Sequence, residues 1–112
     1  MKKTPEMILS KSVCEALRVF GFYFFHPANE GKRTFWERQQ FAMNGGRAGI
    51  ADLIIILRGE VIFVELKASA GRQTPAQKEF QTAVESRGHR YLLWRTVDDA
   101  LDFADKEKIR KN

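Results

Sequence analysis

Residues 49–67 read GIADLIIILRGEVIFVELK, two apolar segments that meet at Arg58-Gly59. Short segments rich in isoleucine and valine on either side of such a turn predict a β-hairpin, with strands at about 52–57 and 60–67. Away from the turn, the hairpin carries Asp52 where the first strand begins and Glu65 and Lys67 where the second ends. Charges are costly to place among buried side chains. Their position therefore points to a functional requirement.

Capping signals predict the helices on either side of the hairpin. Thr4 before Pro5 indicates a helix start, because the hydroxyl caps the helix and proline needs no N–H there. Thr74-Pro75 repeats this signal, and Gln77 is placed to complete a capping box. The predicted elements outside the hairpin are a helix from Pro5 to about Gly21, a strand at 22–26, a short helix at about 34–43, a helix at 74–87, a strand at 90–95 and a final helix that opens at Thr96.

The order of these elements predicts a single α/β domain over residues 1–112, with a mixed central β-sheet flanked by helices, in the order α-β-(α)-β-β-α-β-α. Segments 60–67, 74–87 and 90–95 form a strand–helix–strand crossover, which predicts that the two strands are parallel. Trp94, inside the apolar strand 90–95, is expected in the core. Strands that are apolar on both faces are typical of a sheet covered on both sides.

Composition constrains partner and compartment. Nineteen Lys and Arg against fourteen Asp and Glu give a net charge of +5. This balance fits a polyanionic partner such as nucleic acid or a solvated basic surface equally well. The single cysteine, Cys14, predicts a reducing compartment such as the cytoplasm. The first residues do not have the pattern of a signal peptide, and no apolar run is long enough for a membrane span.

The spacing of the charged residues predicts that they converge. If Leu57 pairs with Glu60, then Asp52 lies opposite Glu65, where two carboxylates repel. Lys67, two residues beyond Glu65, lies on the same face. A divalent ion such as Mg²⁺ would relieve the repulsion and leave positions for phosphate oxygens. The alternative, which spacing alone favours, is that Asp52 caps a turn while the other two side chains point to solvent.

The flanking motifs favour the functional interpretation. HPANEGKR at 26–33, GGRAGIADL at 45–53, FVELK at 63–67 and GRQTPAQ at 71–77 resemble the virus-type replication-repair nuclease (VRR-NUC) domain of the PD-(D/E)XK nuclease superfamily. They occur in the family's order and cover most of the chain. The resemblance implies a restriction-endonuclease-like fold and a Mg²⁺-dependent endodeoxyribonuclease, with Mn²⁺ as a substitute. One departure is Ala51, where the family commonly has a proline.

The resemblance also implies roles for individual residues. Asp52 and Glu65 would be metal-binding catalytic carboxylates, the backbone carbonyl of Leu66 a further ligand, and Lys67 the catalytic lysine. Glu6 matches an acidic residue that binds the same metal, although an acid near a helix N-terminus is also favoured by the helix dipole.

Gln77 matches a catalytic-site glutamine that faces the metal, although the capping box explains it equally well. His26, at a strand end, fits a structural role as well as a catalytic one.

Basic and aromatic residues between 29 and 47 predict a DNA-binding surface, because cations bind phosphates and aromatic faces stack on bases. Phe41 is the aromatic residue of this segment that we expect in the core. The glycines of GGRAGIAD are expected to let a substrate backbone approach closely. The residues predicted to contact DNA are Asn29, Lys32, Arg33, Trp36, Arg38 and Arg47.

The sequence therefore predicts a DNA endonuclease. A compact domain with one active site must pair with a copy of itself to cut two strands symmetrically, and two-fold dimers are the commonest assembly. Small standalone members of the family look like junction-resolving enzymes, so the resemblance implies a homodimer that cleaves branched DNA, such as four-way (Holliday) junctions, in the cytoplasm of a bacterial or phage-infected cell. The alternatives are a nuclease subunit of a larger repair complex and a non-catalytic DNA-binding module with the nuclease fold.

Overall fold

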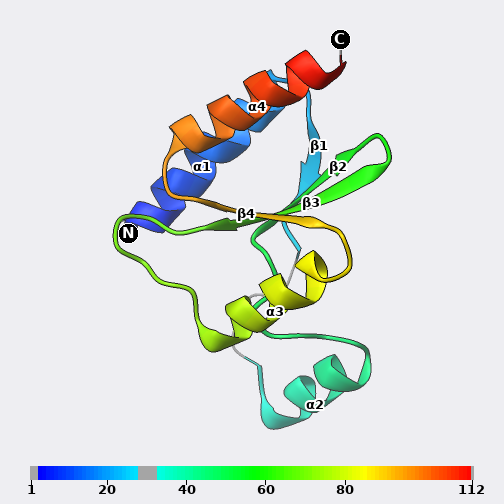
Figure 1. Ribbon diagram of the computed structural model, residues 1–112. Coiled ribbons are helices and arrows are strands. Elements are labelled where there is room, and N and C mark those ends of the chain that lie inside the picture. Colours follow the sequence, from blue (N-terminus) through cyan, green and yellow to red (C-terminus); the bar gives the residue numbers. More distant parts are fainter. Residues whose placement is uncertain (1–2, 28–32, 112) are drawn as a thin grey trace.

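The computed structural model describes residues 3–27 and 33–111, with side chains described up to residue 108. Its elements follow the predicted order (Figure 1). Most observed ends lie within one or two residues of the predicted ones. The elements are α1 (Pro5–Val19), β1 (Tyr23–Phe25), α2 (Phe35–Met43), β2 (Leu53–Leu57), β3 (Glu60–Leu66), α3 (Pro75–Glu85), β4 (Arg90–Trp94) and α4 (Val97–Lys111).

The four strands form one mixed sheet in the order β1-β2-β3-β4. β1, β2 and β3 pair antiparallel, whereas β3 and β4 are parallel, as the crossover predicted. Leu57 pairs with Glu60 and Leu53 with Val64, so the predicted hairpin register is confirmed. Continuing that register by one residue places Asp52 across from Glu65. The turn uses Gly59 at φ 76°, a left-handed conformation that glycine adopts without strain.

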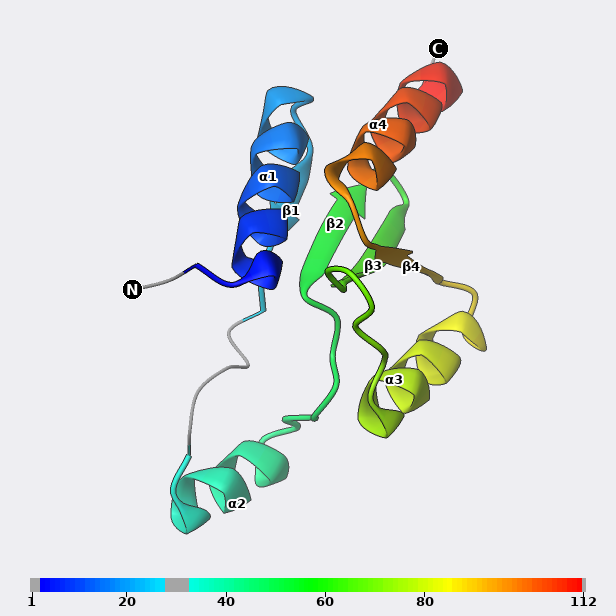
Figure 2. The same ribbon diagram turned by 90° about the vertical axis from the view of Figure 1, so that its left-hand side faces the viewer.

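The main core lies between one face of the sheet and the pair α1 and α4, which run side by side (Figure 2). Trp94 belongs to this core and is 5% exposed, as predicted. A fully buried aliphatic side chain contributes roughly 1.5–3 kcal/mol. The core residues are Leu9, Val13, Leu17, Leu53, Ile55, Ile62, Val64, Leu66, Trp94, Ala100 and Phe103.

The opposite face of the sheet is covered in part by α3. The Phe80 ring packs edge-on against Phe63 at 5.3 Å between centroids and lies 6.2 Å from Tyr91. α2 stands apart from the sheet, beyond α3 (Figures 1 and 2), and has no buried residue. Its N-terminus nevertheless forms a full capping box between Thr34 and Glu37. In the described part of the chain, no helix is long and apolar enough to cross a membrane.

Candidate active site

The two carboxylates of the hairpin meet at the sheet edge where β2 begins and β3 ends. Asp52 Oδ2 accepts a hydrogen bond from the backbone N–H of Leu66 at 2.8 Å, so its side chain reaches across to β3. Glu65 is 1% exposed. Lys67 Nζ lies 3.7 Å from Glu65 Oε2, and only 11% of the lysine side chain is exposed. Asp52, Glu65 and Lys67 therefore converge, as the spacing predicted.

The electrostatics of Glu65 are those of an incompletely compensated charge. Burial, followed by the negative charge of Asp52, raises the pKa of Glu65 to about 8, and Lys67 opposes this only in part. Glu65 Oε1 is buried and receives no hydrogen bond from any described residue. A buried carboxylate oxygen without a hydrogen-bond donor is unfavourable unless a bound ligand supplies the missing contact.

Gln77 does two things at once. Its Oε1 accepts the backbone N–H of Thr74 at 2.8 Å, which completes the α3 capping box. Its Nε2 donates to Glu65 Oε2 at 3.0 Å. The two sequence interpretations of Gln77, helix cap and neighbour of the acidic pair, are therefore both compatible with the structure. Because the cap fixes the amide, the orientation of the Glu65 carboxylate is fixed with it.

The glycine-rich segment before β2 brings α3 close to the sheet. Gly49 has φ 77°, and a methyl group on it would collide with the backbone of Ala76 and lie 2.7 Å from Gln77 N. A methyl group on Gly46 would overlap the ring of Phe41. At these two glycines the close approach that the structure shows is made by the protein's own atoms. The approach of a substrate backbone to the glycine-rich segment stays a prediction. Gly49 lets the N-terminus of α3 carry Gln77 up to Glu65.

Glu6 faces the same site from α1. A cavity of about 480 Å³ is bordered by Glu6, Lys11, His26, Asp52 and Leu66, together with Thr4, Met7 and Ser10. The described residues nevertheless contain no group of three His, Cys, Asp or Glu side chains close enough to hold a metal ion by themselves. Glu6 thus shares a cavity with Asp52 without completing a three-carboxylate cage.

His26 supports Asp52 through the backbone. Its Nδ1 lies 2.6 Å from the carbonyl oxygen of Asp52, and because a carbonyl only accepts, Nδ1 carries the proton. The sequence did not predict this contact. The signal for it is the β1–β2 pairing, in which Phe25 lies opposite Ile54 and the two strand ends come together.

The predicted DNA-binding residues do not gather at the carboxylates. Trp36 (72% exposed) and Arg38 lie on α2, and Arg47 is exposed between α2 and β2. Arg33 is half-buried, with its guanidinium 4.1 Å from the centre of the Phe41 ring. The prediction that Phe41 fills the core was wrong, because its half-buried ring packs on Gly46 and Arg33 and lies outside the core cluster. Asn29 and Lys32 lie outside the described residues.

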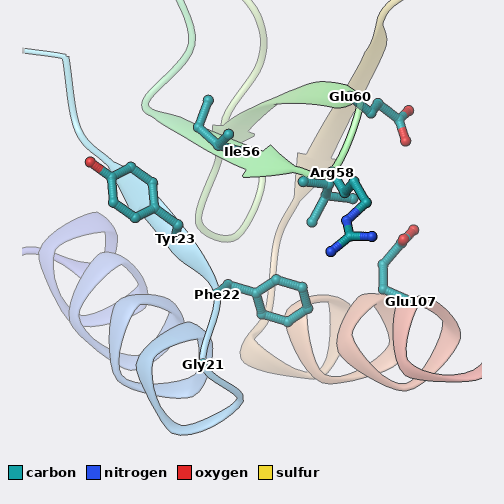
Figure 3. A pocket seen from close by; sticks show the side chains of 8 residues that line it. Gly21, Phe22, Tyr23, Ile56, Arg58, Glu60 and Glu107 are labelled. Carbon is teal, nitrogen blue, oxygen red and sulfur yellow. The ribbon is translucent and has the colours of Figure 1, made fainter. Parts of the chain in front are cut away.

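A second cavity, of about 680 Å³, lies at the other end of the hairpin, between the start of β1, the β2–β3 turn and α4. Arg58, Glu60 and Glu107 gather beside it (Figure 3). Arg90 Nε and Nη2 donate to the two oxygens of Glu60 at 2.7 and 2.9 Å, and Nη2 also donates to Glu107 at 2.9 Å. The acidic groups at this end are therefore paired within the protein.

Two solved structures share this architecture. A structure described as "VRR_NUC domain protein" superposes with a TM-score of 0.70 at 21% sequence identity, covering 95% of this chain and 89% of that chain. Another, described as "VRR_NUC domain", superposes with a TM-score of 0.65 at 22% identity, covering 92% and 97%. This chain has the VRR_NUC fold. The sequence matches no family model and no curated protein.

In the VRR_NUC fold of this chain, the donor set fits a divalent cation. Asp52 and Glu65 provide hard oxygen ligands. Glu65 Oε1, which receives no hydrogen bond from a described residue, is the atom that such an ion would contact. Two carboxylates are enough for Mg²⁺, which keeps several waters and binds substrate phosphates.

Proposed function

We propose that this protein is a metal-dependent DNA endonuclease that hydrolyses phosphodiester bonds. The observation that carries the proposal is the buried Glu65, held next to Asp52 with one carboxylate oxygen lacking a donor and a lysine only 3.7 Å away. A purely structural acid would be paired, as Glu60 and Glu107 are. The VRR_NUC fold and the motifs that resemble the nuclease family support the same conclusion.

Mg²⁺, or Mn²⁺ in its place, would be held by Asp52, Glu65 and the backbone carbonyl of Leu66, with Glu6 facing it across the shared cavity. When bound, the ion supplies positive charge where negative charge grows on the phosphate. The chain prepares the site: Leu66 N–H holds Asp52, and Gln77 holds Glu65. Ligands held in advance need little reorganisation when substrate arrives.

Lys67 is the catalytic side chain of this proposal. Its ammonium group can donate to a phosphate oxygen or to the attacking water while its stem stays packed in the site. Such a donor stabilises the transition state more than the ground state when it is aimed at the oxygen on which charge develops. The same side chain offsets part of the charge of Glu65 before substrate binds.

DNA would extend from this site toward α2. Trp36, Arg38 and Arg47 are exposed, and Arg33 stacks on Phe41. Asn29 and Lys32, which lie outside the described residues, are proposed as DNA contacts from the sequence alone. α2 stands apart from the sheet whose edge carries the carboxylates (Figure 1), so a ligand that touches both must be extended. The net charge of +5 favours such a polyanion.

The substrate we propose is branched DNA, such as a four-way junction, cut by a homodimer in the cytoplasm of a bacterial or phage-infected cell. One chain carries one set of Asp52, Glu65 and Lys67, so symmetric cleavage of two strands requires two copies. A nuclease subunit of a larger repair complex would use the same site with a different partner.

The test is cleavage of a four-way junction, a flap and a linear duplex of matched sequence, in Mg²⁺, Mn²⁺ or EDTA. The parent should cut the junction at paired positions, fail in EDTA and run as a dimer in a solution mass measurement. Lys67→Ala should bind DNA but not cut it. Cutting of plain duplex alone would remove the junction proposal, and a Lys67→Ala protein as active as the parent would remove the site assignment.

A further inference from the structure

Arg95, the first residue after β4, holds the turn that follows Lys67. Its Nη1 donates to the carbonyl oxygens of Ser69 at 2.9 Å and of Gly71 at 2.8 Å. The backbone of Arg95 is itself fixed, because its N–H donates to Asp99 Oδ2 at 2.8 Å in the first turn of α4. An exposed arginine thus links α4 to the segment that joins β3 to α3.

The turn at residues 68–71 needs such support. It is closed by a hydrogen bond from Gly71 N to Ala68 O at 3.0 Å. Ser69 has φ 50°, the one described non-glycine residue with a left-handed backbone. That conformation is unfavourable for a residue with a Cβ. Two carbonyl oxygens turned toward one point also repel each other. A cationic donor between the two oxygens offsets their repulsion and the cost of the left-handed Ser69 backbone. Hydrogen bonds from charged donors are stronger than those from neutral donors.

This turn lies against two residues of the proposed active site. A methyl group on Gly71 would lie 3.5 Å from Lys67 Cδ and 3.7 Å from Glu6 Oε1. The turn therefore flanks both the stem of Lys67 and the Glu6 carboxylate, which come from different elements. The backbone of Lys67 is held on the same side, since its N–H donates to Trp94 O at 3.0 Å, next to Arg95.

We infer that Arg95 is a positioning residue for Lys67: it holds the 68–71 turn against the lysine stem and so keeps Nζ beside Glu65. The inference rests on the proposed nuclease function. A lysine has many rotamers, and confining it in advance lowers the cost of reaching the reactive arrangement. Loss of Arg95 frees the turn, and Lys67 then samples positions in which Nζ no longer faces the site.

The experiment compares Arg95→Ala and Arg95→Lys with Arg87→Ala. Arg87 is the matched control, because it is also exposed and its Nη1 also donates to a backbone carbonyl, that of Ala83 at 2.8 Å. Arg87 follows the C-terminal end of α3 and does not bond the 68–71 turn. Single-turnover cleavage at saturating enzyme and Mg²⁺ should slow on the order of tenfold to a hundredfold in Arg95→Ala. Arg95→Lys should retain more of the rate, and Arg87→Ala should stay within about twofold of the parent.

Chemical rescue separates positioning from general destabilisation. Guanidinium at tens of millimolar should restore Arg95→Ala cleavage by about threefold or more, whereas the same ionic strength of sodium chloride should not. DNA affinity of Arg95→Ala should change no more than that of Arg87→Ala. A loss confined to affinity would make Arg95 a phosphate contact and overturn the inference, as would a rate equal to that of the parent.

A readout without DNA keeps the inference distinct from the proposed function. Amide hydrogen exchange at Gly71 in the free protein should accelerate by roughly tenfold in Arg95→Ala, because the donated bond loses its support. Unchanged exchange would overturn the role of Arg95 even if cleavage fell. A parent protein that cuts no DNA at all would instead overturn the proposed function, whatever the exchange result.

Discussion

The two ends of the β2–β3 hairpin differ in how the charges of their carboxylates are compensated. At the turn end, Arg90 bonds both oxygens of Glu60 and one of Glu107, which is only 4% exposed. At the other end, Glu65 is 1% exposed beside Asp52, and the ammonium group of Lys67 lies 3.7 Å from its Oε2 atom. Glu107 and Glu65 are buried to a similar extent, but the compensation of their charges differs.

The difference separates structural from functional charge. A buried carboxylate that is bonded to arginine has its charge compensated within the protein, and removing the arginine would leave that charge unpaired. Glu65, whose pKa burial and Asp52 raise to about 8, favours the neutral form until a cation is supplied. Perturbed groups of this kind concentrate at functional sites.

Removing one carboxylate from each end should affect activity at one end alone. Asp52→Asn should lower the single-turnover cleavage rate by about a thousandfold, or about 4 kcal/mol, because it removes a proposed metal ligand. Glu60→Gln should cut at the parent rate at a temperature where both variants are folded. Equal losses in the two variants would show that the ends do not differ as proposed.

Removing the cation at the turn end should affect stability alone. Arg90→Ala leaves the buried Glu107 without its arginine and should lower the free energy of unfolding by roughly 2 kcal/mol, moderated because the arginine side chain is 35% exposed. Urea denaturation measures this. Cleavage by the folded variant at low temperature should match that of the parent. A loss of cleavage without a loss of folding would show that the turn end also serves the reaction.

Titration of the metal-free protein should reveal the uncompensated end. The pKa of Glu65 is about 8 in the folded chain and near 4.5 for the unperturbed group, so between these values the folded state holds a proton that the unfolded state has released. The free energy of unfolding should therefore fall by roughly 2 kcal/mol as pH rises from about 5 to about 8. Denaturation in EDTA measures it.

Two controls test whether this pH dependence of the free energy of unfolding comes from Glu65. Glu65→Gln should remove most of this pH dependence, because the amide does not titrate in the range. Mg²⁺ should restore stability to the parent at pH 8 by binding the ionised form, and should do so less in Glu65→Gln. Parallel pH profiles for parent and variant would locate the titration elsewhere.

The smallest effect concerns the two capping boxes. Gln77→Glu keeps a residue that suits the α3 box but adds a third carboxylate beside Glu65, so it should cost about 1 kcal/mol in the metal-free protein at pH 8. Glu37→Gln makes the reverse exchange in the exposed α2 box, far from the acidic pair, and should shift the melting temperature less than Gln77→Glu does. Thermal melts in EDTA compare the two, and equal shifts would mean that Glu65 does not sense position 77.

Most of the fold followed from local signals. The capping signals at Thr4-Pro5 and Thr74-Pro75 predicted two helix starts, since a cap acts within one turn of its own helix. The hairpin register followed from the Arg58-Gly59 turn, which determines which residues pair. Phe41 was misjudged because nothing in the local pattern says which distant atoms will surround its ring.

By itself, the sequence determined the order of the elements, the register of the hairpin and hence the meeting of Asp52 with Glu65, because each depends on spacing along one or two adjacent segments. Only the tertiary structure decided that Gln77 is both cap and partner of Glu65, that His26 holds the Asp52 backbone, and that Arg95 holds the 68–71 turn. Those contacts join residues brought together by strand pairing and by the crossover through α3. No local pattern encodes them, because they depend on how whole elements pack.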